Sequence, residues 1–428
     1  MKVEISRLFN GLTVITDPMP QLESVALGVW VNTGTRNEVR RAMGVSHMLE
    51  HMAFKGTIRR TARDIAEEIE AVGGYLNAYT SREQTAFHAR VLKNDVPLAI
   101  DILADILCSP TFDPAELERE RQVVLQEIGQ ARDTPDDIVF DHLQNVIYPA
   151  QPMGWPILGE QETVAAFTRE DLRAYMDSNY RAGSMYLVAS GAVRHSEILA
   201  LANDAFSTMK RGAVAAPLPA NYEGGDHREI QELEQAHVTF AFPGVSSSDD
   251  DYYVAQVYVT ALGGGMSSRL FQEARERRGL CYSIYAFAHS ARDSGVIGVY
   301  AGTGESEAAQ IGGVVAGEMG ALAESASARE VARAKAQLKS SILMGLERPG
   351  TRAEQIAAQM FALDRVLDVD EMVRRIDEVD IEQIQRFAER VMNSPRPAIA
   401  AIGPVGKLEA YDVFARRFGA PSALRAAE

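Results

Sequence analysis

The feature that most constrains the fold is a break in sequence texture near the middle of the chain. Residues 210–228 are rich in glycine, proline and small side chains and lack apolar periodicity, which is typical of a linker. We therefore expect two domains of similar size, 1–209 and 229–428, joined by this segment. A chain of 428 residues is long enough to bury two cores of that size.

The two halves also repeat one order of predicted elements. In the first half, an apolar strand-like run at 25–31 precedes a polar loop and a helix-like stretch at 43–54. In the second half, the run at 237–242 precedes a polar loop and a helical pattern at 252–262. Such repetition indicates an internal duplication, so we expect the two domains to be alike.

Strand and helix signals interleave within each half. Residues 75–80 and 85–92 alternate as strands do and flank a short polar connection, which predicts an antiparallel pair. Helical patterns follow at 95–108 and 113–131, and most of 305–392 is also helical. The prediction is an α+β fold with two similar domains, each an antiparallel-rich sheet with helices packed on one face.

The strongest functional signal is a pair of histidines four residues apart, His47 and His51, with Glu50 between them. In a helix these three positions share one face. Two neutral imidazoles can bind one Zn²⁺, and a carboxylate beside the metal can accept a proton from the attacking water. The order H-x-x-E-H is the inverzincin signature. The alternative, two core histidines with satisfied hydrogen bonds, fits less well because the chain has only eight histidines.

A catalytic zinc ion needs a third protein ligand, and the helix that begins at Asp113 offers four glutamates. Glu118 lies roughly opposite Glu127 on that helix, and Glu116 is explained by a helix-start role. Glu120 and Glu127 are seven apart and share a face. Spacing alone does not choose between them: one would bind the metal and the other would orient a histidine. Without the histidine motif, a solvated helix face would explain both.

Charge narrows the class of ligand. The chain has 43 Lys and Arg against 59 Asp and Glu, a net charge of −16, which disfavours nucleic acid and favours basic peptides. The first residues carry charges and no apolar stretch, and no run of 18 apolar residues occurs, so we expect no membrane span and a cytoplasmic protein. Cys108 and Cys281 are expected to be separate reduced thiols.

Three segments of the first half resemble the pitrilysin or insulinase family of zinc peptidases, and most closely its short branch that includes mitochondrial processing peptidase and bacterial relatives. They are His47–Thr57, Gly73–Thr85 and Glu118–Ile128. The resemblance implies that Glu127 is the third zinc ligand and that Glu120 supports the site from outside it.

The resemblance also assigns substrate contacts. It implies that the strand carrying Asn77 and Ala78 pairs with the peptide main chain, where the residues alone indicate an ordinary strand. Residues 263–283 are similar to a family region in which an Arg and a Tyr contact substrate, here Arg275 and Tyr282. On the residues alone, Arg275 would precede a helix cap and Tyr282 would begin an apolar strand.

The expected function is a zinc-dependent endopeptidase that acts on peptides or unfolded segments. Relatives of this length form half of a clamshell chamber, so the resemblance implies a homodimer, or a heterodimer with a similar subunit, with Arg275 and Tyr282 supplied by the partner. The competing hypotheses are a non-catalytic structural or assembly subunit on the same fold and a metal-binding module without catalysis. The complete set of His47, Glu50, His51 and Glu127 favours the enzyme.

Overall fold

The computed structural model describes residues 3–394 and 396–419, which form two compact units. The first unit contains the chain up to Gln130 together with Trp155–Leu218 and Met344–Val366. The second contains Ala131–Gly154, Pro219–Leu343 and the chain from Leu367 onward. Each unit thus includes one segment from the other half of the sequence.

The first unit is built on a six-stranded sheet with the order β1-β2-β6-β3-β5-β4. All neighbouring strands are antiparallel except β2 and β6, which run parallel. Because β4 pairs only with β5, it is an edge strand. The strands are β1 (Glu4–Arg7), β2 (Thr13–Pro18), β3 (Ser24–Val31), β4 (Tyr75–Thr80), β5 (Thr85–Leu92) and β6 (Met185–Gly191).

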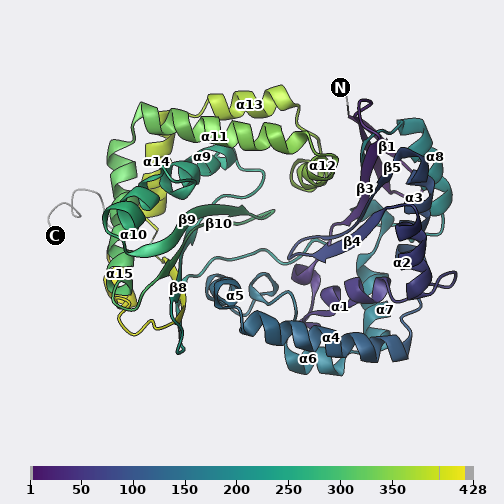
Figure 1. The fold of residues 1–428 in the computed structure, drawn as a ribbon, viewed down its shortest axis with the longest axis horizontal. Coiled ribbons are helices and arrows are strands. Elements are labelled where there is room, and N and C mark those ends of the chain that lie inside the picture. The colour runs from purple at the N-terminus through teal and green to yellow at the C-terminus, as the bar shows by residue number, and fades with distance from the viewer. Residues whose placement is uncertain (1–2, 395, 420–428) are drawn as a thin grey trace. The chain divides into compact units, whose positions relative to one another are not determined.

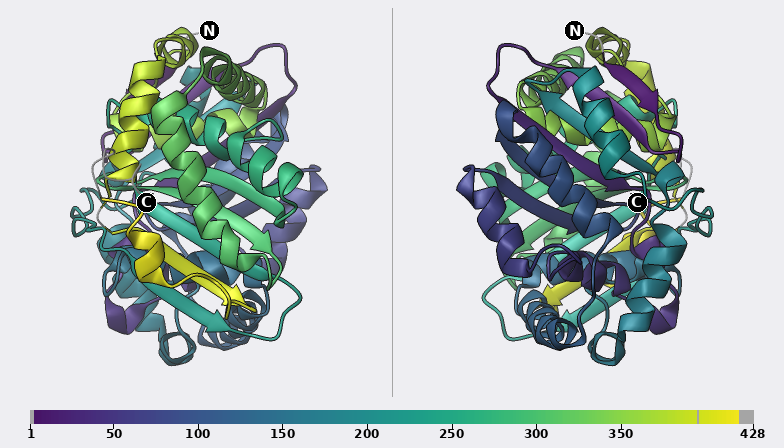
Figure 2. Two further views of the ribbon diagram at one scale, coloured as in Figure 1. Left: turned by 90° about the vertical axis from the view of Figure 1, so that its left-hand side faces the viewer. Right: turned by 90° about the vertical axis from the view of Figure 1, so that its right-hand side faces the viewer.

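Helices cover both faces of this sheet (Figure 1). On one face, alternate β3 residues such as Leu27 and Val29 join a large core with Ile100 and Leu103 of α3. The right-hand view of Figure 2 shows α3 and α8 in front of the strands. The helices of the unit are α1 (Val45–Ala53), α2 (Ala62–Ala71), α3 (Val96–Cys108), α4 (Pro114–Arg132), α6 (Gln161–Ala166), α7 (Arg169–Asn179), α8 (His195–Ala205) and α12 (Pro349–Leu363).

The opposite face of the first sheet is covered by α12, which comes from the second half of the sequence. Ile356 and Ala357 of α12 pack against Trp30 of β3. The Trp30 indole also donates a 3.0 Å hydrogen bond to Glu354, and a buried Arg352 pairs with Asp17 at 2.7 Å. This second layer was not part of the predicted fold.

The second unit repeats the plan with a five-stranded sheet of order β7-β11-β8-β10-β9. Its strands are β7 (Gly225–Ile230), β8 (Ala236–Pro243), β9 (Cys281–Ser290), β10 (Gly295–Thr303) and β11 (Ala398–Gly403). Strands β7 and β11 are parallel, and the other pairs are antiparallel. Strand β7 begins inside the segment 210–228 that the sequence marks as a linker.

The left-hand view of Figure 2 shows helices of the second unit in front of its strands. Helix α5, from the first half of the sequence, packs Val139 and Leu143 against Ala400 and Ile402 of β11, the counterpart of α12 in the first unit. The helices are α5 (Pro135–Ile147), α9 (Tyr252–Gly263), a π-helix (Phe271–Arg277), α10 (Ala308–Ser325), α11 (Ala328–Leu346), α13 (Val369–Asp377), α14 (Ile381–Met392) and α15 (Tyr411–Ala415).

Short 3₁₀ helices complete the described structure. They span Thr35–Asn37, Arg40–Ala42, Lys93–Asp95, Pro152–Gly154 and Ala182–Ser184. Within residues 3–394 and 396–419, none of the helices combines the length and apolar character needed to cross a membrane. The predicted α+β class with two similar, antiparallel-rich domains is confirmed.

Candidate metal centre

Helix α1 presents both histidines on one face and buries the rest of its surface. Met48, Leu49 and Met52 are almost completely buried in the core of the first unit. The helix begins after Gly44, whose φ of 88° favours glycine. The face that remains carries the two imidazoles, at the four-residue spacing expected for helical neighbours.

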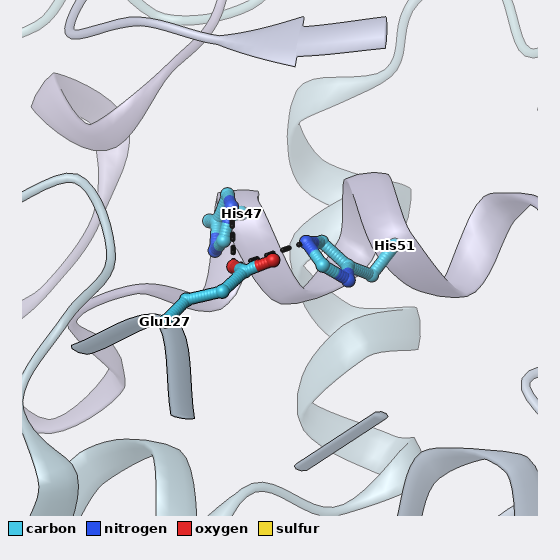
Figure 3. Close-up of side chains that lie close together, drawn as sticks. All are labelled: His47, His51 and Glu127. Carbon is cyan, nitrogen blue, oxygen red and sulfur yellow. Dashed lines mark ion pairs between the residues drawn. The ribbon is translucent and has the colours of Figure 1, made fainter. Parts of the chain in front are cut away.

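Glu127 of α4 faces the two histidines (Figure 3). Its Oε2 lies 3.5 Å from His51 Nε2 and 3.7 Å from His47 Nε2. The side chains of His47 and His51 are 12% and 17% exposed, whereas that of Glu127 is 37% exposed. The two histidines are therefore mostly shielded from solvent, whereas the carboxylate of Glu127 is partly open to it.

The three ligand atoms fit a zinc ion. Ligand bonds of 2.0–2.2 Å in a tetrahedral site place ligand atoms about 3.4 Å apart, close to the two distances to Glu127 Oε2. Two imidazoles with one carboxylate are a donor set of known catalytic zinc sites and leave a fourth position for a small molecule. The distances are too long for direct hydrogen bonds between the ligands.

His51 is oriented by a second glutamate of α4. Its Nδ1 donates to Glu120 Oε2 at 3.0 Å, which leaves Nε2 directed toward Glu127. The other oxygen of Glu120 pairs with Lys55 Nζ at 2.7 Å. Glu120 is only 6% exposed. His51 and Lys55 each contact one of its oxygens, so this carboxylate is not directed at the group formed by His47, His51 and Glu127.

Glu50 lies beside the cluster and is held by the edge strand. Its Oε2 accepts a 2.6 Å hydrogen bond from Thr80 Oγ1 of β4. Burial raises the pKa of the Glu50 carboxyl, and the charge of Glu127 raises it further, against the opposing effects of Thr80 and His51. Burial, with a smaller contribution from His51, lowers the pKa of His47 to about 3, so this imidazole is neutral at pH 7, as a metal ligand must be.

The remaining glutamates of α4 are engaged elsewhere. Glu118 is exposed and pairs with Arg121 at 3.0 Å, and Glu116 pairs with Arg119. Asp113 caps the helix by accepting from the amide of Ala115 at 2.8 Å. These contacts agree with the helix-face argument made from spacing.

The structure brings Asn77 and Ala78 onto the edge strand β4, near the candidate centre. The amide of Ala78 donates to Asn77 Oδ1 at 2.8 Å, and the bond between Thr80 and Glu50 connects this strand to α1. An edge strand has one row of main-chain groups without a partner strand. The strand can therefore accept another extended chain.

Arg275 and Tyr282 lie in the second unit and contact each other. The guanidinium of Arg275 lies 5.1 Å from the centre of the Tyr282 ring and 4.6 Å from that of Phe271. Tyr282 is 75% exposed. Arg275 belongs to a π-helix, a rare conformation often found at functional sites, and its carbonyl accepts from the amide of Gly279, as the predicted cap requires.

Three residues that position the centre were not singled out from the sequence: Glu38, Lys55 and Thr80. The Glu38 carboxylate is buried and accepts from the amides of Gly44 and Ser46 at 2.8 and 2.9 Å, so it caps α1. Thr80 and Lys55 act through tertiary contacts. A single sequence carries no signal for such pairs. Thr80 is 30 positions from Glu50, Lys55 is 65 positions from Glu120, and an irregular loop separates Glu38 from the start of α1.

Comparison with known proteins places the chain in a family. Residues 13–161 match the family described as insulinase (peptidase family M16), and residues 166–338 match the peptidase M16 inactive domain. A protein of Rickettsia felis named as an uncharacterized zinc protease is 38% identical over 94% of this chain and 97% of its own length. The chain belongs to the insulinase family of peptidases (M16).

Other relatives in this family include proteins of bacteria and plants. An uncharacterized zinc protease of Bacillus subtilis is 34% identical over 93% of this chain and 98% of its own length. A probable mitochondrial-processing peptidase subunit beta of Arabidopsis thaliana is 36% identical over 97% of this chain and 81% of its own length. The resemblance inferred from the zinc motif is thereby confirmed.

Solved structures share the fold. A protease from Helicobacter pylori superposes with a TM-score of 0.87 over 94% of this chain and 99% of its own, at 20% identity. A Pseudomonas fluorescens protein described as a peptidase M16 inactive domain gives a TM-score of 0.88 over 96% of this chain and 100% of its own, also at 20% identity. All the residues of the candidate centre lie within 13–161, the part matched by the insulinase description.

Proposed function

We propose that this M16 family member is a zinc-dependent endopeptidase that hydrolyses peptides or unfolded segments. His47, His51 and Glu127 would hold the ion, and Glu50 would act as general base. The observation that carries the proposal is the convergence of two imidazoles and a carboxylate, with 3.5 and 3.7 Å between the histidine nitrogens and the Glu127 oxygen, beside the largely buried Glu50. A Zn²⁺ ion bound there would supply Lewis acidity to water and to the substrate carbonyl.

The chain's own residues would handle the proton. Glu50 would accept a proton from the attacking water and pass it to the departing amine. Burial favours the protonated carboxyl, so the proton can be held between the two steps. Thr80 fixes the Glu50 carboxylate on one side, and Glu120 fixes the imidazole of His51 on the other.

Strand β4 would bind the substrate. An extended peptide added to this edge would pair with main-chain groups near Asn77 and Ala78, a mode in which backbone hydrogen bonds supply affinity. The hydrogen bond from Thr80 to Glu50 ties that edge to the general base. The net charge of −16 favours basic peptides as substrates.

We further propose that the active form is a dimer in which Arg275 and Tyr282 act on substrate held by another chain. Arg275 and Tyr282 both carry hydrogen-bond donors and lie against each other, and Tyr282 is exposed, so the pair is suited to stabilise a developing oxyanion. Several relatives are named as subunit beta of mitochondrial-processing peptidase, a name that denotes one member of an assembly. This chain carries both the zinc set, His47, Glu50, His51 and Glu127, and the Arg-Tyr pair, so a homodimer would contain every residue of the proposed site. A heterodimer with a similar subunit is the alternative form.

The test compares wild type with Glu50→Gln on an unstructured basic peptide, with bound zinc measured in both. We expect equal zinc content and a loss of cleavage of about 10²–10⁴-fold in the variant, because Gln cannot accept the proton. Glu118→Gln, an exposed change on α4, is the matched control and should cleave normally. Equal cleavage by wild type and Glu50→Gln, or zinc bound by both with cleavage by neither, would contradict the proposal and favour a non-catalytic subunit.

A further inference from the structure

A second group of metal-binding side chains lies in the second unit, apart from the residues discussed so far. His142 of α5 meets His227 and Glu229 of β7, and their ligand atoms all lie within 4.8 Å of one another. His142 Nε2 is 2.9 Å from Glu229 Oε2, and the centres of the two imidazole rings are 4.5 Å apart. None of these residues takes part in the proposed peptidase mechanism.

The fold explains why the three side chains meet. Residues 227 and 229 are two apart in a strand, so their side chains point to the same face of the sheet. Helix α5 packs on the sheet formed by β7, β11 and β8, with Val139 and Leu143 in that core, and His142 lies between these two positions. Strand β7 is the edge of the sheet, so the group has access to solvent.

The chemistry of the group suits a cation. Glu229 Oε2 is the polar partner that the described structure gives the buried His142 Nε2, so an imidazole nitrogen and a carboxylate oxygen already face each other there. Gln231 donates to the other oxygen of Glu229 at 2.6 Å, which orients the carboxylate toward the histidines. The nearby Arg228 is occupied by Asp226 at 3.0 Å, so it does not neutralise Glu229.

We propose that His142, His227 and Glu229 form a second site for a divalent transition metal ion such as Zn²⁺. The site would need a small adjustment of side-chain rotamers, since ligand atoms around zinc are about 3.4 Å apart. Three protein donors leave one position to water. His142 belongs to α5, which comes from the first half of the sequence, and the other ligands belong to β7. The bound ion would therefore link α5 to the edge strand of the second sheet.

Zinc binding to the full-length chain, at micromolar free Zn²⁺, tests the site. Wild type should bind one more zinc ion per chain than His227→Ala. His47→Ala should also bind one zinc ion fewer than wild type, because it removes a ligand of the other site. His289→Ala is the matched control, because His289 is also an exposed histidine on a strand of the same unit, and it should bind as much zinc as wild type. Equal zinc content in His227→Ala and His289→Ala would overturn the proposal.

Thermal unfolding gives a second readout that does not depend on catalysis. In the His47→Ala chain, which keeps only the second site, saturating zinc should raise Tm by about 5 °C, and the added His227→Ala change should abolish that shift. The absence of a shift in His47→Ala would contradict the assigned role of the ion. Peptide cleavage should be the same in wild type and His227→Ala, so failure of this site is distinguishable from failure of the peptidase proposal.

Discussion

At the scale of single residues, the two glutamates that share a face of α4 differ in depth and partners. The side chain of Glu120 is 8% exposed and is held by His51 and Lys55. Glu127 is 37% exposed and faces both histidines. The sequence places both on one face but contains no information about depth, so spacing alone left the choice between them open.

Removing the charge of Glu120 should weaken zinc binding without removing a ligand. In Glu120→Gln, His51 loses its anionic hydrogen-bond partner. Its imidazole is then less well oriented and binds a metal ion less strongly. We expect zinc affinity to fall by about 10–100-fold, measured by competition with a chelator. All chains in this experiment also carry His227→Ala, so that only the site at His47 and His51 is measured. Glu118→Gln serves as the control. An affinity equal to that of the control would show that Glu120 does not position the ligand.

At the scale of elements, helix α1 depends on a carboxylate from the preceding loop. Glu38 accepts hydrogen bonds from the amides of Gly44 and Ser46, and also from the Ser46 hydroxyl. Burial raises the pKa of Glu38 to about 7, against the effect of these hydrogen bonds. The charged form of this cap is therefore costly in the folded protein.

This cap predicts a pH dependence of stability. Because the folded pKa is raised above the unfolded value of 4.5, the contribution of Glu38 is complete below pH 4.5 and is lost as pH rises through about 7. We expect the free energy of unfolding of wild type to lose about 3 kcal/mol more than that of Glu38→Gln between pH 4.5 and 8. Urea unfolding at each pH measures this difference.

The control for Glu38 is Glu170→Gln, an exposed change in the first turn of α7. Its pH profile should follow that of wild type. If Glu38→Gln shows the same pH dependence as wild type and the control, the cap does not titrate in this range. If the variant is less stable at every pH by a constant amount, only the hydrogen bonds of the cap contribute.

Most elements were predictable because their periodicity is local. The strand pair 75–80 and 85–92 and the histidine-bearing helix occupy the predicted segments almost residue for residue. The placement of α5 and α12 was not predictable, because an apolar helix face does not specify which sheet it covers. The caps and supports supplied by Glu38 and Thr80 depend on tertiary contacts in the same way.

At the scale of the whole molecule, each unit is completed by a helix from the other half of the sequence. Helix α12 covers the first sheet and α5 covers the second. Each compact unit is therefore discontinuous in sequence, and the predicted domain boundaries 1–209 and 229–428, joined by residues 210–228, stay a prediction. The zinc set lies in one unit and the Arg-Tyr pair in the other.

Mixed dimers can establish whether the two sets act across chains. Glu50→Gln lacks the base, and Tyr282→Phe lacks the phenolic donor, so each variant alone should be impaired. If the sites are shared between chains, random mixing restores one complete site in each mixed dimer, or about a quarter of wild-type cleavage. If the mixture shows only the average of the two variants, Tyr282 acts within its own chain or takes no part.

The most direct test of the zinc peptidase assignment compares the zinc affinities of Glu127→Gln and Glu118→Gln. Both changes are made in a parent chain that carries His227→Ala. Both glutamates lie on α4, but only Glu127 faces His47 and His51. We predict that Glu118→Gln binds one zinc ion as tightly as its parent chain and that Glu127→Gln binds it at least about 100-fold more weakly. Equal affinity in the two variants would contradict the assignment.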